Sequence, residues 1–366
     1  MSVPVLGRLS LLDRWLPAWI LAAMGTGLVL GRVVPDLAGA LDAVEVGSVS
    51  LPIAVGLLVM MFPVLAKVRY RDTGPVLRDR RLMVASLGVN WVLAPAFMFA
   101  LAWLLLPDLP EYRTGLVIVG LARCIAMVLI WNDLACGDRE AAAVLVAVNS
   151  LFQVVAFGAL GWFYLQLLPS WLGLPTTSAG FSAAAITTSV LIFLGVPLAA
   201  AVLTRTLAER ARGREWYETR LVPRLGPWAL YGLLFTILVL FALQGHTILD
   251  RPLDVVRIAL PLLVYFAVVF TASLLLGRAL RLGHARSTTL AFTAAGNNFE
   301  LAIAVCVATF GVTSGQALAG VVGPLIEVPA LVGLVYLSLW ARPRLFPGTA
   351  PTAPVAPVPA STGAGA

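Results

Sequence analysis

The amino-acid sequence predicts an all-α integral membrane protein with ten transmembrane helices. Of its 366 residues, 60% are hydrophobic and 12% are charged, whereas soluble domains carry about 25% charged residues. The mean hydropathy is +0.95. The apolar runs are continuous rather than alternating, which favours helices over a β-barrel. These observations exclude a soluble enzyme core.

Each expected helix rests on an apolar run of about 20 residues, the length that crosses the hydrocarbon layer. In chain order the helices are Trp15 to Val33, Ser48 to Ala66, Leu82 to Leu106, Thr114 to Leu134, Ala141 to Leu168, Phe181 to Thr204, Leu225 to Gly245, Arg257 to Leu280, Ser287 to Val312 and Gln316 to Trp340. An N-terminal segment, 1–14, precedes them, and a Pro- and Ala-rich tail, 341–366, follows. The tail is expected to be disordered, because it lacks the apolar residues that a core needs.

The loop residues predict the orientation of the chain. Lys and Arg are enriched in the cytoplasmic loops of membrane proteins. If both termini are cytoplasmic, 20 of the 25 basic residues lie on the inner side, and the outer side has only Arg32, Arg113, Arg251 and Arg257. This topology accounts for the net charge of +7, and no nucleic-acid binding is expected. His246 and His284 lack a second ligand at metal spacing, so both are expected to be solvated at helix ends.

Ten helices divide into two sets of five, 15–168 and 181–340. An odd number of spans in each set places the two sets in opposite orientations in the bilayer. Inverted repeats of this kind are the common architecture of secondary transporters. The sequence therefore predicts two inverted five-helix repeats, in which the fourth and ninth helices are equivalent.

Three charged residues fall inside expected spans, namely Arg123, Glu300 and Glu327. A charged residue at the bilayer centre costs roughly 2.5 to 3.5 kcal/mol on insertion scales, so each of these residues is a candidate for function. With both carboxyls ionised the buried charges would sum to −1, and one carboxyl would lack a partner. Two interpretations remain open. That carboxyl exchanges a proton in each transport cycle, or an Arg-Glu pair joins two helices while the other Glu lies in a hydrated cavity.

The ninth expected helix contains Gly296-Asn297-Asn298, which is a poor helix sequence in any solvent. We expect the helix to break there and to present backbone groups to a cavity or to neighbouring protein. The alternative is that the asparagines hydrogen-bond to adjacent helices without any break.

Glu300 is the preferred carrier of a coupling proton. It follows Asn297 by three residues, and residues three apart share a helix face. Its carboxyl and the asparagine amides should therefore point into one cavity. Glu327 is expected to be either the partner of Arg123 or a fixed hydrogen-bonding group.

The three cysteines have different settings. A cysteine in a membrane span is usually packing material, but Cys124 follows Arg123 directly. A neighbouring guanidinium favours the thiolate form, which is the form that binds soft ions. Cys136 and Cys306 are interpreted as incidental.

Three long segments carry a family resemblance: GLARCIAMVLIWNDLACGD from Gly120 to Asp138, FTAAGNNFELAIAV from Phe292 to Val305, and SGQALAGVVGPLIEVPALVGLVYLSLW from Ser314 to Trp340. Over nearly its whole length the sequence resembles the arsenite efflux permeases of the yeast-type arsenical-resistance group, within the bile acid, arsenite and riboflavin transporter superfamily. The resemblance implies ten helices in two inverted repeats, with the fourth and ninth unwound and crossing in a core domain beside a panel domain. The residues themselves indicate a break in the ninth helix only.

The resemblance also implies a function. The chain would be a carrier in the plasma membrane and not an enzyme, without a cofactor, and arsenite would leave the cytoplasm in exchange for protons. Antimonite is a candidate second substrate. The cysteine matching Cys124 and the glutamate matching Glu300 are implied to be needed for transport.

Arsenite at neutral pH is an uncharged trihydroxide, and a single thiolate can hold its arsenic by exchange for one hydroxyl and still release it. The expected site residues are Cys124 as the arsenic ligand, Asn297, Asn298 and Arg123 around the substrate, and Glu300 and Glu327 for proton coupling. The rival interpretation is a sodium-coupled symporter of an organic anion, from the bile-acid branch of the same superfamily. In that scheme Cys124 has no role, and the sodium dependence of transport separates the two.

Overall fold

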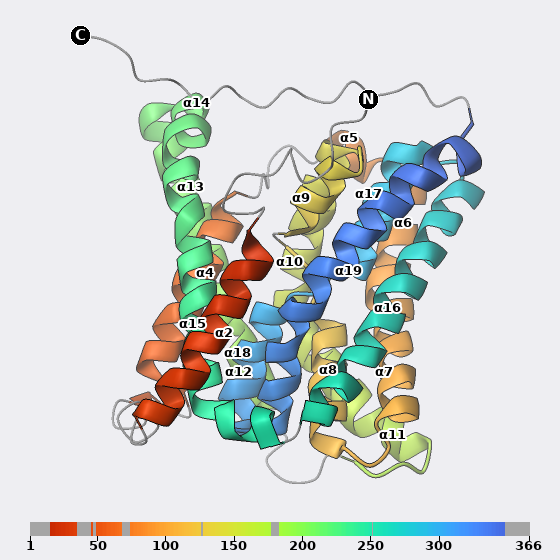
Figure 1. Cartoon of the computed structure of the whole chain (residues 1–366). Coiled ribbons are helices and arrows are strands. Elements are labelled where there is room, and N and C mark those ends of the chain that lie inside the picture. The colour runs from red at the N-terminus through yellow and green to blue at the C-terminus, as the bar shows by residue number, and fades with distance from the viewer. Residues whose placement is uncertain are drawn as a thin grey trace.

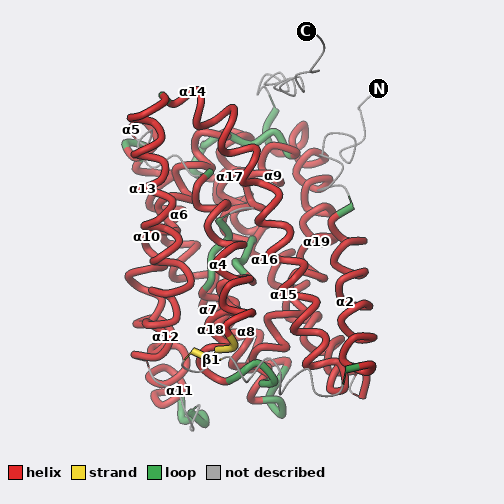
Figure 2. Tube along the Cα trace, turned by 90° about the vertical axis from the view of Figure 1, so that its left-hand side faces the viewer, coloured by secondary structure: helices red, strands yellow, loops and turns green. Residues whose placement is uncertain are grey.

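Long helices that run between the two ends of a bundle make up almost all of the structure (Figures 1 and 2). The computed structural model describes residues 15–34, 45–46, 49–67, 74–125, 127–176, 183–250 and 252–347. In its first half the elements are α2 (Leu16–Val33), β1 (Glu45–Val46), β2 (Val49–Ser50), α4 (Leu51–Ala66), α5 (Gly74–Leu77), α6 (Arg80–Gly88), η2 (Val89–Leu93), α7 (Ala94–Leu105), α8 (Pro110–Leu121), α9 (Met127–Leu134), α10 (Arg139–Trp162), η3 (Phe163–Leu167) and α11 (Leu168–Trp171). In its second half they are α12 (Ala183–Val190), η4 (Leu191–Gly195), α13 (Val196–Arg212), α14 (Arg214–Trp216), η5 (Tyr217–Leu221), α15 (Val222–Asp250), α16 (Pro252–Ala279), α17 (Gly283–Ala295), α18 (Phe299–Phe310) and α19 (Gly315–Leu345).

The length and composition of these helices fit a membrane. Among the described residues, six helical stretches are long and apolar enough to cross one: Arg80–Leu105, Arg139–Trp171, Ala184–Arg212, Arg214–Leu243, Pro252–Ala279 and Gly315–Leu345. The shorter apolar helices are Ala18–Val33, Leu51–Ala66 and Phe299–Phe310. The chain is therefore a multi-pass membrane protein. We call the end of the bundle at which α2 begins and α19 ends the terminal end; it is uppermost in Figure 1.

Helices are present where the sequence predicts them, with shifted ends and two interruptions. The stretch expected at 114–134 is divided into α8 and α9, and the one expected at 287–312 is divided into α17 and α18. Helix α19 continues to Leu345, so the predicted start of the tail at 341 is several residues too early. The remainder of that tail from 348, like the segment 1–14, lies outside the described residues.

Proline shapes several of the long helices. In the described chain the five-residue π-helical segments η2, η3, η4 and η5 each end two residues before a proline, namely Pro95, Pro169, Pro197 and Pro223. A proline ring collides with the carbonyl four residues earlier and lacks an N–H to bond it. A π-helical turn moves that carbonyl aside, so the helix continues past the proline.

The helices pack in two groups. In the first group α15 packs against α2 and α4, and α13 packs against α4. In the second group α16 packs against α7, α17 and α19, while α19 also packs against α8 and α18. Helix α12 belongs to the first group through η4, which packs against α4 and α13, and α6 and α10 belong to the second group because they pack against α17. The groups meet where α12 contacts α10 and α18, and where α2 contacts α19.

Small residues bring α2 close to α15 in the first group. A Cβ at Gly31 would collide with the backbone of Ala242, and one at Gly27 would collide with Leu238 O. Gly25, on the same helix, has nothing within 4 Å of its Cβ position. Close approach of backbones at small residues is a usual basis of helix association in membranes.

Substitution Gly31→Ala should destabilise the first group by about 1 to 3 kcal/mol, the usual effect of overpacking. Thermal unfolding in detergent should show a lower midpoint than the unsubstituted protein. Gly25→Ala is the matched control, since it adds the same methyl group to the same helix in open space. Equal midpoints for the two variants would contradict the close α2–α15 contact.

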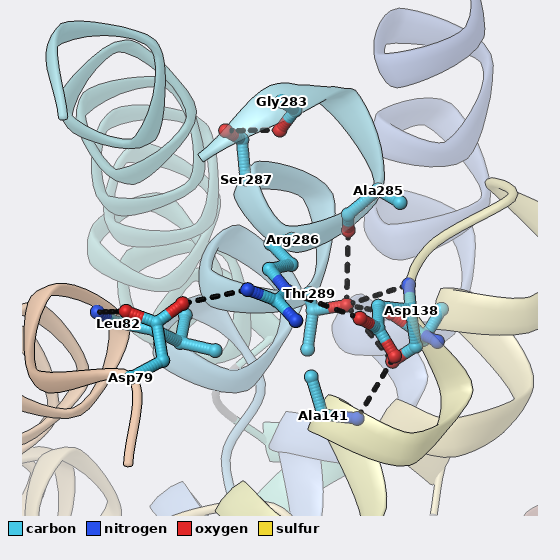
Figure 3. Close-up of polar contacts among 10 residues, drawn as sticks. Asp79, Leu82, Asp138, Ala141, Gly283, Ala285, Arg286, Ser287 and Thr289 are labelled. Carbon is cyan, nitrogen blue, oxygen red and sulfur yellow. Dashed lines mark hydrogen bonds and ion pairs between the residues drawn. The ribbon is translucent and has the colours of Figure 1, made fainter. Parts of the chain in front are cut away.

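Arg286 joins three helices of the second group at the terminal end (Figure 3). Its guanidinium lies between two carboxylates, donating from Nη1 to Asp79 Oδ2 at 2.7 Å and from Nε to Asp138 Oδ2 at 3.3 Å. Asp79 also caps α6 by accepting from Leu82 N, and Asp138 caps α10 by accepting from Ala141 N. Each carboxylate thus stabilises a helix N-terminus and an ion pair together, which fixes the starts of α6 and α10 against α17.

Thr289 extends this cluster to α9. Its hydroxyl donates to Asn132 Oδ1 at 2.7 Å and accepts from the backbone N–H of Asp138 at 2.9 Å. Asn132 is fully buried near the end of α9. The terminal ends of α6, α9, α10 and α17 are therefore held together by polar contacts.

His284 is a correction to the sequence interpretation. It was expected to be solvated, but it is 3% exposed, in the first turn of α17. Its Nε2 lies 3.3 Å from Ser338 O of α19, and its ring packs edge-on against Phe346. The prediction failed because a position near a helix end does not show whether another helix covers it. His246 lies in α15, and its side chain is outside the described structure.

The opposite end of the second group has polar contacts of its own. Arg257 donates from Nη1 to Asp108 Oδ2 at 2.7 Å, and this hydrogen bond holds the pKa of the Asp108 carboxyl below its ordinary value. Tyr112 Oη donates to Asp254 Oδ2 at 3.1 Å. These contacts join the start of α8 to the start of α16.

Candidate functional site

Two helix interruptions meet in the second group. After α8 the chain is extended at Ala122, and after α17 it is extended at Gly296. The two short segments pair antiparallel, with Arg123 opposite Asn297. Cys124 N donates to Gly296 O at 3.2 Å, and Asn298 N donates to Ala122 O at 2.9 Å. The backbone groups that the interruptions release are thus satisfied by each other, as hydrocarbon surroundings demand.

The break predicted at Gly296-Asn297-Asn298 is present, and the resemblance's implied break in the fourth helix is present as well. The residues of the fourth helix gave no sign of it. A long-range partner imposes that break, because Ala122 and Cys124 bond to the other segment rather than along a helix.

Side chains from later helices complete the crossing. The backbone N–H of Arg123 donates to Gln153 Oε1 of α10 at 2.9 Å, and that of Asn297 donates to Glu327 Oε1 of α19 at 3.2 Å. Both pairs are separated by 30 residues. The two halves of the chain therefore support the crossing in the same way, one with an amide and the other with a carboxyl.

Each half also caps a helix of the other half. Asn297 Nδ2 donates to Val119 O near the end of α8 at 2.8 Å, and Arg123 Nη1 donates to Ala294 O near the end of α17 at 3.1 Å. Asn298 Oδ1 accepts from Leu301 N and caps the start of α18. The crossing therefore needs side chains and backbone groups from both halves of the chain.

Arg123 is fully buried, and carbonyl groups hold its charge. Its guanidinium donates to Gly120 O, to Ala294 O and, at 2.7 Å, to the hydroxyl of Tyr265. The C-terminal ends of α8 and α17 carry partial negative charge, which favours a cation there. Among the described residues no carboxylate pairs with it. Of the two roles expected for Glu327, the pair with Arg123 is therefore wrong, and the fixed hydrogen bond is present, because Glu327 accepts from the backbone N–H of Asn297.

A cavity of about 20 Å³ lies beside the crossing. Its lining residues are Met60, Met61, Val64, Cys124, Ile125, Met127, Asn297, Asn298, Glu300 and Glu327. Five of the six residues predicted for the site are among them, and Arg123 is not. This space is enough for about one water.

Two of the lining residues carry polar atoms without a hydrogen-bond partner in the described structure. These buried atoms are Asn297 Oδ1, an acceptor, and Asn298 Nδ2, a donor. An unsatisfied buried polar group costs about 1 to 3 kcal/mol. Both atoms can therefore gain from a small ligand with hydroxyl groups.

The cavity is lined by several sulfur-containing side chains, and the sequence predicted only one of them, Cys124. Besides the Cys124 thiol, three of the seven methionines line it: Met60, Met61 and Met127. Thiol and thioether sulfur are soft ligands. The only signal in the sequence was the Met60-Met61 pair, and apolar residues in an apolar helix do not show which face they occupy.

Gly296 leaves the room that Cys124 needs. A Cβ at Gly296 would lie 3.0 Å from Cys124 Cβ and 3.6 Å from its Sγ. Contacts of 3.0 Å are tighter than ordinary packing allows. Glycine at this position therefore permits the close approach of the cysteine.

The chain is similar to known transporters over nearly its full length. Residues 54–251 match the family described as Sodium Bile acid symporter family. The chain is 61% identical over 347 residues to the arsenical-resistance protein Acr3 of Corynebacterium glutamicum, a match that covers 95% of this chain and 94% of that protein. It is 34% identical over 348 residues to an uncharacterised transporter of Synechocystis, covering 90% and 88% of the two chains. It is 29% identical over 348 residues to the arsenical-resistance protein Acr3 of Alkaliphilus metalliredigens, covering 92% and 95%.

Proposed function

This chain belongs to the sodium bile acid symporter family and within it to the group of Acr3 arsenical-resistance proteins, and from that membership we propose that it is a secondary carrier that exports arsenite and confers arsenic resistance. It is a transporter rather than an enzyme. The near-complete match to a protein named for arsenical resistance supports the substrate class.

The single observation that carries the proposal from the structure is the composition of the cavity. It places one thiol, Cys124, with the two asparagine amides and two carboxyls around a water-sized space. Trivalent arsenic bonds to sulfur, and its hydroxyl groups suit the unpartnered atoms of Asn297 and Asn298. One thiolate holds arsenic less tightly than three, which allows release on the far side. Antimonite has the same chemistry and is a further candidate substrate.

The proposed architecture is ten spans in two inverted repeats, 15–168 and 181–340. The equal 30-residue spacing of Arg123 with Gln153 and of Asn297 with Glu327 supports it. The first group of helices would be a panel, and the second group, which holds the crossing, would be a core. Both termini would be cytoplasmic in a plasma-membrane protein, because the basic loop residues concentrate on that side.

A topology test follows from this orientation. A reporter that works only in the cytoplasm should be active when it is fused after Pro347, beyond the end of α19. A reporter that works only outside the cytoplasm should be active when it is inserted at Leu174, after α11. Finding both reporters on one side of the membrane would contradict an odd number of spans between them.

Proton exchange is the proposed driving reaction. Glu300 and Glu327 both line the cavity, and neither forms an ion pair within the described structure. A carboxyl without a cationic partner in a poorly hydrated site readily exists in the neutral form. Substrate and proton could therefore compete for one cavity and bias the movement of core against panel.

Everted membrane vesicles provide the test. Arsenite accumulation should follow an imposed proton gradient, with the vesicle interior acidic, and should not respond to sodium. Sodium-coupled transport of an organic anion is the second candidate, favoured by the description of the matched family. Arsenite accumulation that requires sodium and ignores the proton gradient would contradict proton exchange. Sodium-dependent transport of an organic anion by vesicles that do not accumulate arsenite would establish the second candidate.

A further inference from the structure

Two helical stretches of the first group are longer than a membrane requires. Ala184–Arg212 has 29 residues and Arg214–Leu243 has 30. At 1.5 Å per residue each is about 43 to 45 Å long, against about 30 Å of hydrocarbon. Gly213, with a φ of 86°, joins them in a tight turn, and α14, which follows this turn, is the uppermost helix in both views of the fold (Figures 1 and 2). The turn therefore projects beyond the hydrocarbon layer at the terminal end.

The charged residues of these two stretches lie in the projecting part. Between residues 205 and 224 there are six arginines and three glutamates, whereas the runs 184–204 and 225–243 contain no Asp, Glu, Lys or Arg. An uncharged helical run of about 20 residues spans about 30 Å, the thickness of the hydrocarbon layer. The edge of that layer therefore lies near residue 205 on α13 and near residue 224 on α15. We call residues 205–224 the projecting hairpin.

Arg205 pairs with two of the three glutamates of the projecting hairpin. It is 9% exposed, and it donates from Nε to Glu209 Oε1 at 2.7 Å and from Nη2 to Glu218 Oε1 at 3.0 Å. The third glutamate, Glu215, is exposed. Most of the negative charge of the projecting hairpin is thus neutralised internally.

Four arginines of the projecting hairpin face outward. Arg210, Arg212, Arg220 and Arg224 are exposed, and within the described part of the chain none of them forms an ion pair. Arg212 stacks on Trp216, with its guanidinium carbon 4.6 Å from the ring centroid. The outer surface of the projecting hairpin is therefore cationic and open to an anion.

On α15 this cationic surface continues into exposed aromatic rings. Trp228 is 55% exposed and Tyr231 is 54% exposed, and the two rings meet edge-on with their centroids 6.0 Å apart. Arg224 precedes Trp228 by four residues and Tyr231 by seven, so the three side chains share one side of the helix.

The spacing of these residues along α15 fits the layers of a bilayer. Trp and Tyr are enriched where the hydrocarbon meets the headgroups. Arg224 lies one helical turn beyond Trp228, about 6 Å farther out, which is the level of the lipid phosphates. Arg220 lies about 12 Å farther out, and a long arginine side chain can reach back toward the same level.

A comparable pair in α19 has its guanidinium already engaged. Arg344 also follows an exposed tryptophan by four residues, donates from Nη1 to Trp340 O at 2.9 Å, and lies 4.2 Å from the centroid of that ring. Among the described residues Arg224 makes no such contact. Its N–H donors are therefore available to a ligand beside the aromatic rings.

We propose that the outer face of η5 and α15 binds an anionic phospholipid, whose phosphate is held by Arg220 and Arg224 and whose glycerol and upper acyl carbons pack on Trp228 and Tyr231. A guanidinium matches two phosphate oxygens with parallel N–H donors. The surface favours lipids with a net negative charge, because the ammonium group of a zwitterionic headgroup offsets the attraction. Membrane topology alone requires basic residues on one side, but it does not require their alignment with exposed aromatic rings. The inference is independent of the substrate that the carrier moves.

Thermal unfolding in a neutral detergent tests the proposal. The purified chain is heated with rising amounts of phosphatidylglycerol, of phosphatidylcholine, or of inorganic phosphate at constant ionic strength. The test variant carries Arg220→Gln and Arg224→Gln. The matched control carries Arg78→Gln and Arg81→Gln, which remove the same charge at the terminal end of the second group. Both control residues are exposed, but the residues four positions after them are buried, so no exposed stripe continues from them.

Phosphatidylglycerol should raise the unfolding midpoint of the unsubstituted chain and of the control alike. One arginine near an anionic surface is worth about fivefold in affinity, so the test variant should need roughly 25-fold more phosphatidylglycerol for the same rise. Phosphatidylcholine should give a smaller rise that is equal in all variants, and inorganic phosphate should give none. A variant with Arg220→Lys and Arg224→Lys keeps the charge but loses the forked donors, so its response should fall between those of the unsubstituted chain and the test variant.

Three results would overturn the proposal. The first is an equal response of the test variant and the unsubstituted chain to phosphatidylglycerol. The second is an equal loss in the control, which would indicate a general effect of charge. The third is the same rise with inorganic phosphate, which would indicate a site for a soluble anion. If the glutamine variant does not fold, the lysine variant decides, because an undiminished response in it contradicts the forked contact with phosphate.

Discussion

Replacing Cys124 with serine should reduce arsenite accumulation in everted vesicles to the level of vesicles that lack the protein. Serine keeps the approximate size of the side chain and a hydrogen-bonding group, but it has no affinity for a soft ion. Cys124 is the single cysteine that lines the cavity, so no other thiol can replace it there. The crossing itself should survive, because Cys124 contributes to it through its backbone N–H.

The other two cysteines are the matched controls. Cys306 is fully buried in α18, and Cys136 is half-buried after α9; neither lines the cavity. Cys136→Ser and Cys306→Ser should keep transport near that of the unsubstituted chain. Normal transport by the Cys124→Ser protein would remove thiolate binding from the mechanism, whatever the controls show.

Glu300→Gln should stop gradient-driven arsenite transport while leaving a folded carrier. Glutamine fixes the neutral form of the side chain and cannot release a proton, so exchange has no coupled step. Glu300 lines the cavity, and within the described part of the chain it has no cationic partner to lose. Arsenite binding can persist, which a binding measurement on the purified variant would show as an affinity close to the original.

Glu327→Gln is the informative companion. The carboxyl of Glu327 accepts a hydrogen bond from Asn297 N, and the amide of Gln153 makes the equivalent bond to Arg123 N. Glutamine should therefore satisfy the crossing, and the variant should fold. If Glu300→Gln retains transport with normal pH dependence while Glu327→Gln loses it, the two carboxyls must exchange roles.

The sequence predicted those parts of the site that depend on neighbouring residues alone. The break at Gly296-Asn297-Asn298 follows from residues that disfavour a helix. Asn297 and Glu300 both line the cavity, but Asn297 precedes α18, so their helical spacing is not the reason. The break at Ala122 could not be predicted in that way. Its sequence is compatible with a helix, and only pairing with a segment far along the chain makes the extended form favourable.

The sequence also could not predict where the buried charged side chains would lie in the fold. The charge count singled out Arg123 and the two glutamates, but it could not show that carbonyl groups at two helix ends would hold the guanidinium. The sequence adjacency of Arg123 and Cys124 suggested a charged neighbour for the thiol. In an extended segment successive side chains point to opposite sides, and Arg123 accordingly lies away from the cavity.

The exchange of caps between the halves has a consequence for biosynthesis. Asn297 lies 175 residues beyond Ala122, one of the carbonyls that its amide contacts. At about 5 to 20 residues per second, the ribosome takes roughly 10 to 35 s to supply it. During that interval Val119 O and Gly120 O can accept from Ala122 N and Arg123 of the first half, but Ala122 O has to wait for Asn297 and Asn298. Water or an insertion factor can satisfy that carbonyl until the second half arrives.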